Sequence, residues 1–343
     1  MKIVVIGAGA IGGYLGGKLS DRHEVVLVGR TLLVATINSR GLKIIEPRLE
    51  RWARARAVDS IETAFQTIDR FDLALFTVKN FDTETTIEQM KPFADRIDRI
   101  LSFQNGVESE EVLGRVFGRN KIIAGTILNP ISIPEIGSVR LEKYKGGLGL
   151  ASIDGQSIEA LTVTLKDTGL LVRVYTDYRS MKWSKLLLNL IGNATSAILD
   201  MTTRETFNDR MVFRVEVAAL REAVQVMRAL SIRPITLPGY PVPLLVFALR
   251  FLPIPLLQII MRPLAAAGRG DKPPSLLMDL RNGKTKSEID DLNGAIVRWG
   301  ESIGVKTPIN EFLTNIVKDL AAGRVDRAVW RRQTTELAQT LFP

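Results

Sequence analysis

A short apolar run near the start of the chain breaks abruptly into closely spaced glycines. Residues 2–6 read Lys-Ile-Val-Val-Ile, and residues 7–13 read Gly-Ala-Gly-Ala-Ile-Gly-Gly before a helical pattern begins. This GxGxxG spacing is typical of dinucleotide binding, because the first glycine permits the turn, the second admits a pyrophosphate and the third lets the helix pack on the strand. The alternative is a glycine-rich turn that binds no nucleotide. We expect the backbone N–H groups here to bind phosphates, through Gly7, Gly9, Ala10, Ile11 and Gly12.

The end of the next apolar run favours one of the two nicotinamide dinucleotides. Residues 24–28 read Glu-Val-Val-Leu-Val, which predicts a strand, and Gly29 and Arg30 follow it. NAD-binding units carry an acid here for the ribose 2′-hydroxyl, whereas a guanidinium suits a 2′-phosphate. Arg30 therefore predicts NADP(H) as the cofactor, with a solvated arginine at a strand end as the alternative.

The composition narrows the chemistry that the chain can perform. Its 343 residues are enough for two domains. It has no cysteine and a single histidine, His23, so we expect no disulfide, no thiol nucleophile, no histidine base and no metal site. An acid–base catalyst must then be a lysine, glutamate, aspartate or tyrosine.

The net charge of +9 raises the question of nucleic acid. The basic residues are scattered, however, and the densest cluster, residues 48–56, reads as a loop or an edge strand. A basic surface also attracts anionic small molecules, so we expect no nucleic-acid partner. No apolar signal segment precedes the glycine motif, and we expect a cytoplasmic protein.

Apolar runs alternate with helical patterns as far as residue 127. The runs 72–78, 100–103 and 121–127 predict buried parallel strands, separated by helices. Parallel sheets bind ligands at the carboxyl ends of their strands. Three polar residues follow such ends, Arg30, Lys79 and Asn105, which predicts that they share one site; a plain turn at Asn105-Gly106 is the alternative.

The character of the chain changes near residue 176. Before it, three short segments (137–141, 148–150 and 171–174) are expected to add an antiparallel edge to the sheet. After it, the pattern is helical to the end. We therefore predict an α/β chain with two domains, a Rossmann-like NADP-binding domain over 1–176 and an all-α substrate and dimerisation domain over 177–343.

The helical half carries polar residues in apolar surroundings. Residues 179–198 predict one apolar helix in which Lys185, Asn189 and Asn193 recur at four-residue intervals, on one stripe. Polar groups on a largely buried helix need partners, and a ligand is one candidate; a solvated stripe is the alternative. Further along, Ser275 reads as a helix N-cap after two prolines. Glu288 lies at the edge of the apolar stripe of a helix from about residue 287, so its carboxylate can face inward; a first-turn acid that favours the helix dipole is the alternative.

Taken together, these motifs resemble the ketopantoate reductase (2-dehydropantoate 2-reductase) family. The similarity spans the chain: the glycine motif, Lys79, Gln104-Asn105-Gly106, Trp183-Ser184-Lys185 with Asn189 and Asn193, Pro274-Ser275-Leu276, and Ser287-Glu288-Ile289-Asp290. The helical-domain set is the specific part. The resemblance implies reduction of a 2-oxo acid by NADPH, with ketopantoate in pantothenate biosynthesis as the first candidate.

The resemblance also implies roles for these residues. Lys185 would be the catalytic lysine, which protonates the carbonyl oxygen as hydride arrives and stabilises the negative charge there. Glu288 would lie near that lysine, and Asn105 would position substrate and nicotinamide. Asn189, Asn193 and Ser275 would hold the substrate's hydroxyl and carboxylate, and Lys79 and Arg30 would contact the cofactor.

Two departures from the family pattern bear on the substrate. One extra residue lies between Asp279 and Glu288, in a turn. The stretch 241–263 is more apolar than a small polar substrate requires. Its interior prolines and Arg250 argue against a transmembrane helix. We expect no stable membrane insertion, and instead a helical excursion that caps the cleft or lies in a homodimer contact.

Three function classes therefore remain open: a reductase of ketopantoate or a bulkier 2-oxo acid, a non-catalytic NADP-binding regulator, and a peripheral membrane protein anchored through residues 241–263.

Overall fold

The computed structural model describes residues 1–269 and 273–342, which divide into two compact units. Unit 1 comprises Met1–Lys182 together with Leu237–Tyr240, and unit 2 comprises Trp183–Thr236 and the chain from Pro241. The predicted α/β architecture, with an N-terminal parallel sheet and a C-terminal helical domain, is confirmed. The predicted boundary at residue 176 stays a prediction.

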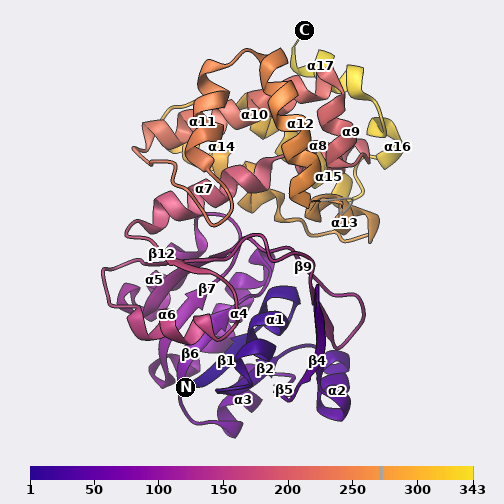
Figure 1. Ribbon diagram of the computed structural model, residues 1–343. Helices are drawn as coiled ribbons and strands as arrows, with labels where there is room; N and C mark the ends of the chain where they lie inside the picture. The colour runs from indigo at the N-terminus through magenta and orange to yellow at the C-terminus, as the bar shows by residue number, and fades with distance from the viewer. Residues whose placement is uncertain (270–272, 343) are drawn as a thin grey trace. The chain divides into compact units, whose positions relative to one another are not determined.

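Unit 1 is built on an eight-stranded sheet (Figure 1). In sheet order its strands are β12 (Val172–Val174), β11 (Leu148–Ser152), β8 (Ile122–Ile127), β7 (Ile97–Ser102), β6 (Phe71–Phe76), β1 (Lys2–Ile6), β2 (Glu24–Val28) and β5 (Arg56–Val58). The six strands from β8 to β5 are parallel, while β11 pairs antiparallel with β8. The central strands are buried and apolar, as strands covered on both faces must be.

Helices and short 3₁₀ turns connect these strands. They are α1 (Ala10–Leu19), α2 (Thr31–Arg40), α3 (Ile61–Thr67), η1 (Asn80–Asp82), α4 (Thr83–Met90), η2 (Lys91–Arg96), α5 (Ser109–Phe117), η3 (Arg119–Lys121) and α6 (Glu159–Lys166).

A second, four-stranded sheet changes one expectation. Its order is β4 (Leu49–Ala53), β3 (Leu42–Glu46), β10 (Ser138–Leu141) and β9 (Ile131–Ser132). The prediction that segment 137–141 extends the main sheet is wrong, because β10 pairs in parallel with β3 instead. The prediction of an edge strand within 48–56 is confirmed, since β4 lies at the edge of this second sheet.

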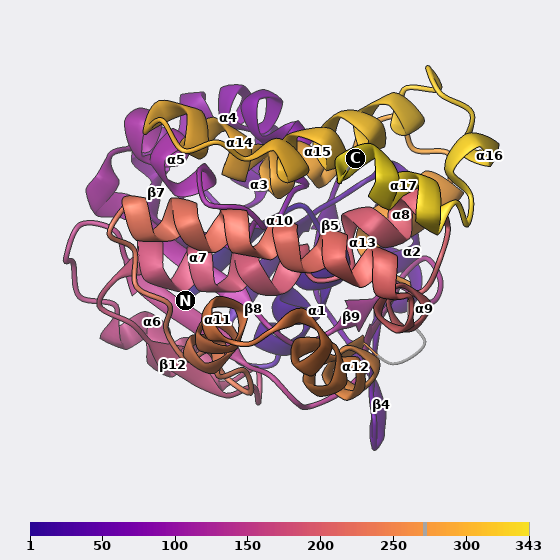
Figure 2. The same cartoon turned by 90° about the horizontal axis from the view of Figure 1, so that it is seen from above.

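Unit 2 is helical. It contains the greater part of α7 (Tyr178–Leu190), which begins in unit 1, and then α8 (Ala194–Leu199), α9 (Thr203–Asn208), α10 (Arg210–Ala229), α11 (Val242–Phe251), α12 (Ile254–Arg269), α13 (Ser275–Arg281), η4 (Glu288–Asp291), α14 (Asn293–Ser302), α15 (Pro308–Ala321), α16 (Arg327–Trp330) and α17 (Thr334–Leu341). The longest, α10, lies between α11 and α12 on one side and α14 and α15 on the other (Figure 2).

The single helix predicted over residues 179–198 is wrong, because the chain turns between α7 and α8. Gly192 has a φ of +59°, and a Cβ there would lie 2.5 Å from the Thr203 side chain. The turn is held by the buried carboxylate of Glu216, which accepts hydrogen bonds from the Gly192 N–H at 2.9 Å and from the Thr195 hydroxyl. Only glycine fits this combination of backbone and space.

The apolar stretch 241–263 forms two helices rather than one. α11 ends at Phe251 and α12 begins at Ile254, with Pro253 between them. Among the described residues, no helix combines the length and the apolar character needed to cross a bilayer. The cytoplasmic location expected from the sequence stays a prediction.

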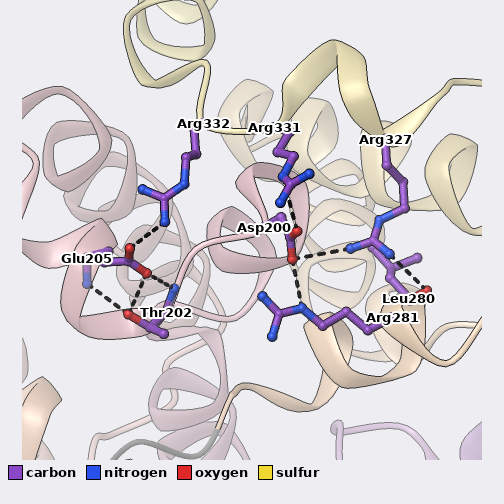
Figure 3. A network of polar contacts seen from close by, with 8 residues as sticks. All are labelled: Asp200, Thr202, Glu205, Leu280, Arg281, Arg327, Arg331 and Arg332. Carbon is purple, nitrogen blue, oxygen red and sulfur yellow. Dashed lines mark hydrogen bonds and ion pairs between the residues drawn. The ribbon is translucent and has the colours of Figure 1, made fainter.

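Helices α8 and α13 are joined at both ends. At their starts, the Asn193 side chain contacts Ser275 and the Leu276 N–H. At their ends, Asp200 forms ion pairs with Arg281 at 2.8 Å, Arg327 at 3.3 Å and Arg331 at 3.6 Å (Figure 3). The Asp200 side chain is only 18% exposed, so this carboxylate connects α13 and the C-terminal segment to α8.

We predict that Asp200→Asn lowers the free energy of unfolding by about 1–2 kcal/mol, because three guanidinium groups lose a partly buried anion. Asn tolerates the left-handed backbone of residue 200 (φ +52°), so the change isolates the charge. Urea unfolding should show the difference, and high salt should shrink it. The control Asp319→Asn removes a more exposed pair with Arg324 and should cost under about 0.5 kcal/mol. An equal cost for the two variants would contradict this assignment.

Candidate functional site

Steric constraints fix the glycine turn between β1 and α1. Gly7 has a φ of +98°, and a Cβ there would lie 2.8 Å from the backbone nitrogen of Val78. At Gly12 a Cβ would lie 2.3 Å from the Gly7 carbonyl oxygen and 2.4 Å from the Thr77 hydroxyl. Thr77 in turn donates a hydrogen bond to the Gly7 carbonyl at 2.8 Å. The close packing of α1 on the end of β1 therefore requires glycine at both positions.

The glycine between them differs. A Cβ on Gly9 would meet no atom of the described residues within 4 Å. The packing of the protein therefore does not explain this glycine, whereas a ligand lying close to the backbone would. Gly9 is also the N-cap of α1, with no acid in the first turn, so the first N–H groups of the helix are suited to an anion. These residues fit the pyrophosphate of a dinucleotide.

Arg30 lies at the neighbouring strand end. It is exposed and occupies the N-cap position of α2, directly after β2. The turn before it is fixed, since the Ala8 N–H donates to the Val28 carbonyl at 2.9 Å and the Gly29 N–H donates to that of Val58 at 3.0 Å. Within the described part of the chain, the Arg30 guanidinium forms no ion pair. The Arg30 guanidinium is therefore available to bind an anionic group beside the glycine turn.

The other two predicted residues of unit 1 also follow parallel strands. Lys79 comes after β6 and precedes η1, and Asn105 comes after β7; both are half-buried. Because β2, β1, β6 and β7 are adjacent and parallel, their carboxyl ends share one edge of the sheet, and the shared site expected there stays a prediction. The loops at this edge are joined, since the Asn80 side chain donates to the Asn105 carbonyl at 2.9 Å.

Sequence reasoning did not find a buried ion pair that contacts the loop carrying Asn105. Lys182 is 2% exposed and Glu110 is fully buried, with 2.7 Å between Nζ and Oε1. The same ammonium donates to the Gln104 carbonyl at 2.6 Å, and the Gln104 side chain donates to the Val78 carbonyl and to Thr83. These bonds fix the backbone of the loop that carries Asn105. Glu110 reads in the sequence as an ordinary first-turn acid, so it gave no signal of burial.

Lys185 and Asn189 lie on the α7 segment of unit 2. They are one turn apart on one face of the helix, and both are half-buried. The flanking positions Trp183, Leu186 and Leu187 are buried, which fixes the rotation of the helix about its axis. An ammonium and an amide are thus displayed together from a rigid helix.

Asn193 does not continue that stripe, because the chain turns at Gly192. It is 2% exposed and lies at the N-cap position of α8. Its Oδ1 accepts from the Leu276 N–H at 3.3 Å, and its Nδ2 lies 3.5 Å from the Ser275 hydroxyl, a long hydrogen bond. The structure thus brings Asn193 and Ser275 together. Ser275 is not the expected N-cap: Pro274 holds that position, and Ser275 is the first helical residue and is exposed.

Glu288 is buried, at 3% exposure, in the short 3₁₀ turn η4. The regular helix expected from about residue 287 begins instead at Asn293, as α14. The Ser287 hydroxyl accepts from the Ile289 N–H at 3.2 Å and fixes the start of η4. The backbone that carries the Glu288 side chain is therefore fixed, and its carboxylate is shielded from solvent. The roles of all these residues stay predictions.

Two family models match the sequence. The model described as "Ketopantoate reductase PanE/ApbA" matches residues 3–155, and the corresponding C-terminal model matches residues 177–321. A 2-dehydropantoate 2-reductase from Pyrococcus horikoshii is 27% identical over 324 residues, which cover 93% of this chain and 97% of that protein.

Solved structures show the same architecture. A PanE/ApbA family ketopantoate reductase from Ralstonia eutropha is 28% identical, with a TM-score of 0.77 over 94% of this chain and 99% of that one. D-mandelate dehydrogenase, solved with NADH and anilino(oxo)acetate, has a TM-score of 0.78 at 23% identity, over 94% of this chain and 99% of that one. At that identity the second similarity shows the fold alone.

The different surroundings of two glycines give a matched pair of variants. Gly9→Ala places a methyl group where no described atom lies, so stability should change by less than about 1 kcal/mol, while the Kd for dinucleotide should rise about tenfold or more. Gly12→Ala forces the methyl group against a carbonyl and should cost about 2 kcal/mol or more of stability. Urea unfolding and titration with NADPH measure both. Unchanged affinity in Gly9→Ala would contradict the phosphate assignment.

Proposed function

The chain belongs to the ketopantoate reductase family and is an oxidoreductase, and from that membership we propose that it reduces 2-dehydropantoate (ketopantoate) to pantoate with NADPH, in pantothenate biosynthesis. The observation that carries the proposal is the match of both family models along most of the chain. It is supported by a glycine turn whose middle glycine is explained by a ligand rather than by packing.

The preference for NADPH over NADH rests on Arg30. An exposed guanidinium follows β2, where an acid would otherwise bind the ribose 2′-hydroxyl. A 2′-phosphate accepts two parallel hydrogen bonds from arginine, and the ion pair adds to them. Lys79, at the end of β6, would supply a second positive charge to the cofactor.

The proposed chemistry needs a proton donor at the substrate's carbonyl oxygen. The bound cofactor supplies hydride to the carbonyl carbon, and negative charge then develops on the oxygen. Lys185, on the rigid α7, stabilises that charge and gives up a proton. The buried Glu288 is proposed as the carboxylate that works with this lysine.

The remaining polar residues are proposed as substrate contacts. Asn105 orients the carbonyl relative to the cofactor, and Asn189, Asn193 and Ser275 hold the hydroxyl and carboxylate. The contact between Asn193 and Ser275 supports a shared role. A bulkier 2-oxo acid is the second candidate, since D-mandelate dehydrogenase, whose fold is similar, was solved with anilino(oxo)acetate.

The direct test is the oxidation of NADPH by the purified protein with a set of 2-oxo acids. Ketopantoate should give the highest kcat/KM, and phenylglyoxylate, the oxo acid that corresponds to mandelate, is the bulky comparison. A higher kcat/KM with phenylglyoxylate would move the assignment to the bulkier substrate. Tight NADPH binding without turnover of any 2-oxo acid would overturn the reductase and favour an NADP-binding regulator.

Lys185→Ala should lower kcat by about 10²–10⁴, because the developing oxyanion loses its proton donor and its counter-charge. The Kd for NADPH and the thermal midpoint should stay near the original values. Lys306→Ala, which removes an exposed lysine of the same unit, is the matched control and should leave kcat within about twofold. A Lys185→Ala protein with unchanged kcat would show that another group donates the proton.

Arg30→Ala should raise the KM for NADPH about 10- to 100-fold, through the loss of a charge-assisted contact, and should leave the KM for NADH nearly unchanged. Steady-state kinetics with both cofactors measure the two values. The control Arg115→Ala removes another exposed arginine of unit 1 and should change neither. Equal effects on NADPH and NADH would contradict recognition of the 2′-phosphate by Arg30.

A further inference from the structure

Helices α11 and α12 display large apolar side chains to solvent. On α11 the exposed residues are Leu244, Phe247 (57%) and Phe251, spaced as one helical face, and on α12 they are Leu256, Ile259 (66%) and Ile260. We call these six residues the apolar platform. Single exposed apolar residues are ordinary, but three on each of two consecutive helices, with the Phe247 and Phe251 rings 4.9 Å apart, mark a surface that binds a partner or a membrane.

Two polar side chains of α12 are turned toward the rest of unit 2, opposite to the pattern of an ordinary surface helix. Gln258 donates to the Phe207 carbonyl at 3.0 Å, and Arg262 donates to the carbonyls of Phe207 and Asn208. At the end of α11, the carbonyls of Leu249 and Leu252 accept hydrogen bonds from Arg221 of α10. Protein contacts thus fix both helices and satisfy the end of α11, while their apolar faces are left to solvent.

The segment that carries the platform is basic in sequence. Residues 223–270 contain five arginines and no aspartate or glutamate. Arg250 is exposed and lies over the Phe251 ring at 5.0 Å. The carboxylates on the adjacent helices α9 and α10 are engaged elsewhere: Glu205 pairs with Arg332, Asp209 caps α10, and Glu216 and Glu222 are buried.

We propose that the apolar platform adsorbs reversibly onto an anionic phospholipid membrane surface, without crossing it. Phe and Leu side chains flanked by arginine are the composition of elements that lie in the interfacial layer of a bilayer. Anionic headgroups complement the exposed Arg250. A second copy of the chain fits less well, because a twofold contact would bring two arginine-bearing faces together with no carboxylate from these helices.

The test is co-sedimentation of the full-length protein with lipid vesicles. The protein should bind vesicles of phosphatidylcholine and phosphatidylglycerol, bind pure phosphatidylcholine far less, and dissociate in high salt. The double variant Phe247→Ser/Phe251→Ser should bind at least about tenfold more weakly. Arg250→Gln should weaken binding and reduce its dependence on salt. Val163→Ser, at a residue on α6 that is 60% exposed, is the matched control and should bind as the original chain does.

Each alternative has its own signature. Equal binding of the original chain and the double phenylalanine variant would show adsorption by net charge alone and would overturn the proposal. Equal binding to neutral and anionic vesicles would also overturn it. Light scattering after gel filtration identifies the other occupant: a dimer that dissociates in the double variant, with no vesicle binding, would assign the platform to a second copy. Unchanged thermal midpoints and NADPH affinity confirm that each variant is folded.

Discussion

The absence of a side chain at Gly12 is the constraint on which unit 1 depends. With a Cβ 2.3 Å from the Gly7 carbonyl, α1 could not begin where it does, and its N-terminus would move away from the carboxyl edge of the sheet. The close packing of α1 on β1 and on Thr77, in the loop after β6, follows from that contact. The proposed phosphate site thus depends on this close packing, and Gly9 leaves room for the ligand beside the backbone.

In unit 2, hydrogen bonds from backbone N–H groups to two buried carboxylates fix a turn and a helix start. Three candidate residues of this unit lie at helix starts or turns: Asn193, Ser275 and Glu288. Glu216 holds the turn at Gly192, while Glu222 accepts the N–H groups of Ile309 and Asn310 at the start of α15, both at 2.9 Å. Burial raises the pKa of Glu222, and those hydrogen bonds act against that rise. Helix ends that are satisfied in this way hold polar side chains rigidly.

The parallel sheet, the glycine turn and the strand-end positions of Arg30, Lys79 and Asn105 could be predicted, because each is a local pattern of apolar runs and glycines. The break at Gly192 could not, since it depends on Thr203 and Glu216, which are distant in sequence. The Lys182–Glu110 pair was missed for the same reason: burial of a charge is a tertiary property. The second sheet was missed because β10 joins a partner, β3, from much earlier in the chain.

In the proposed reaction, hydride passes from a bound nicotinamide to the carbonyl carbon of a 2-oxo acid. The decisive measurement is a single turnover of ketopantoate with NADPH deuterated at the transferable position, followed by mass spectrometry of the product. We predict pantoate that carries one deuterium at the carbon bearing the new hydroxyl group. Pantoate without deuterium, or NADPH oxidised with no 2-hydroxy acid formed, would rule out this hydride transfer.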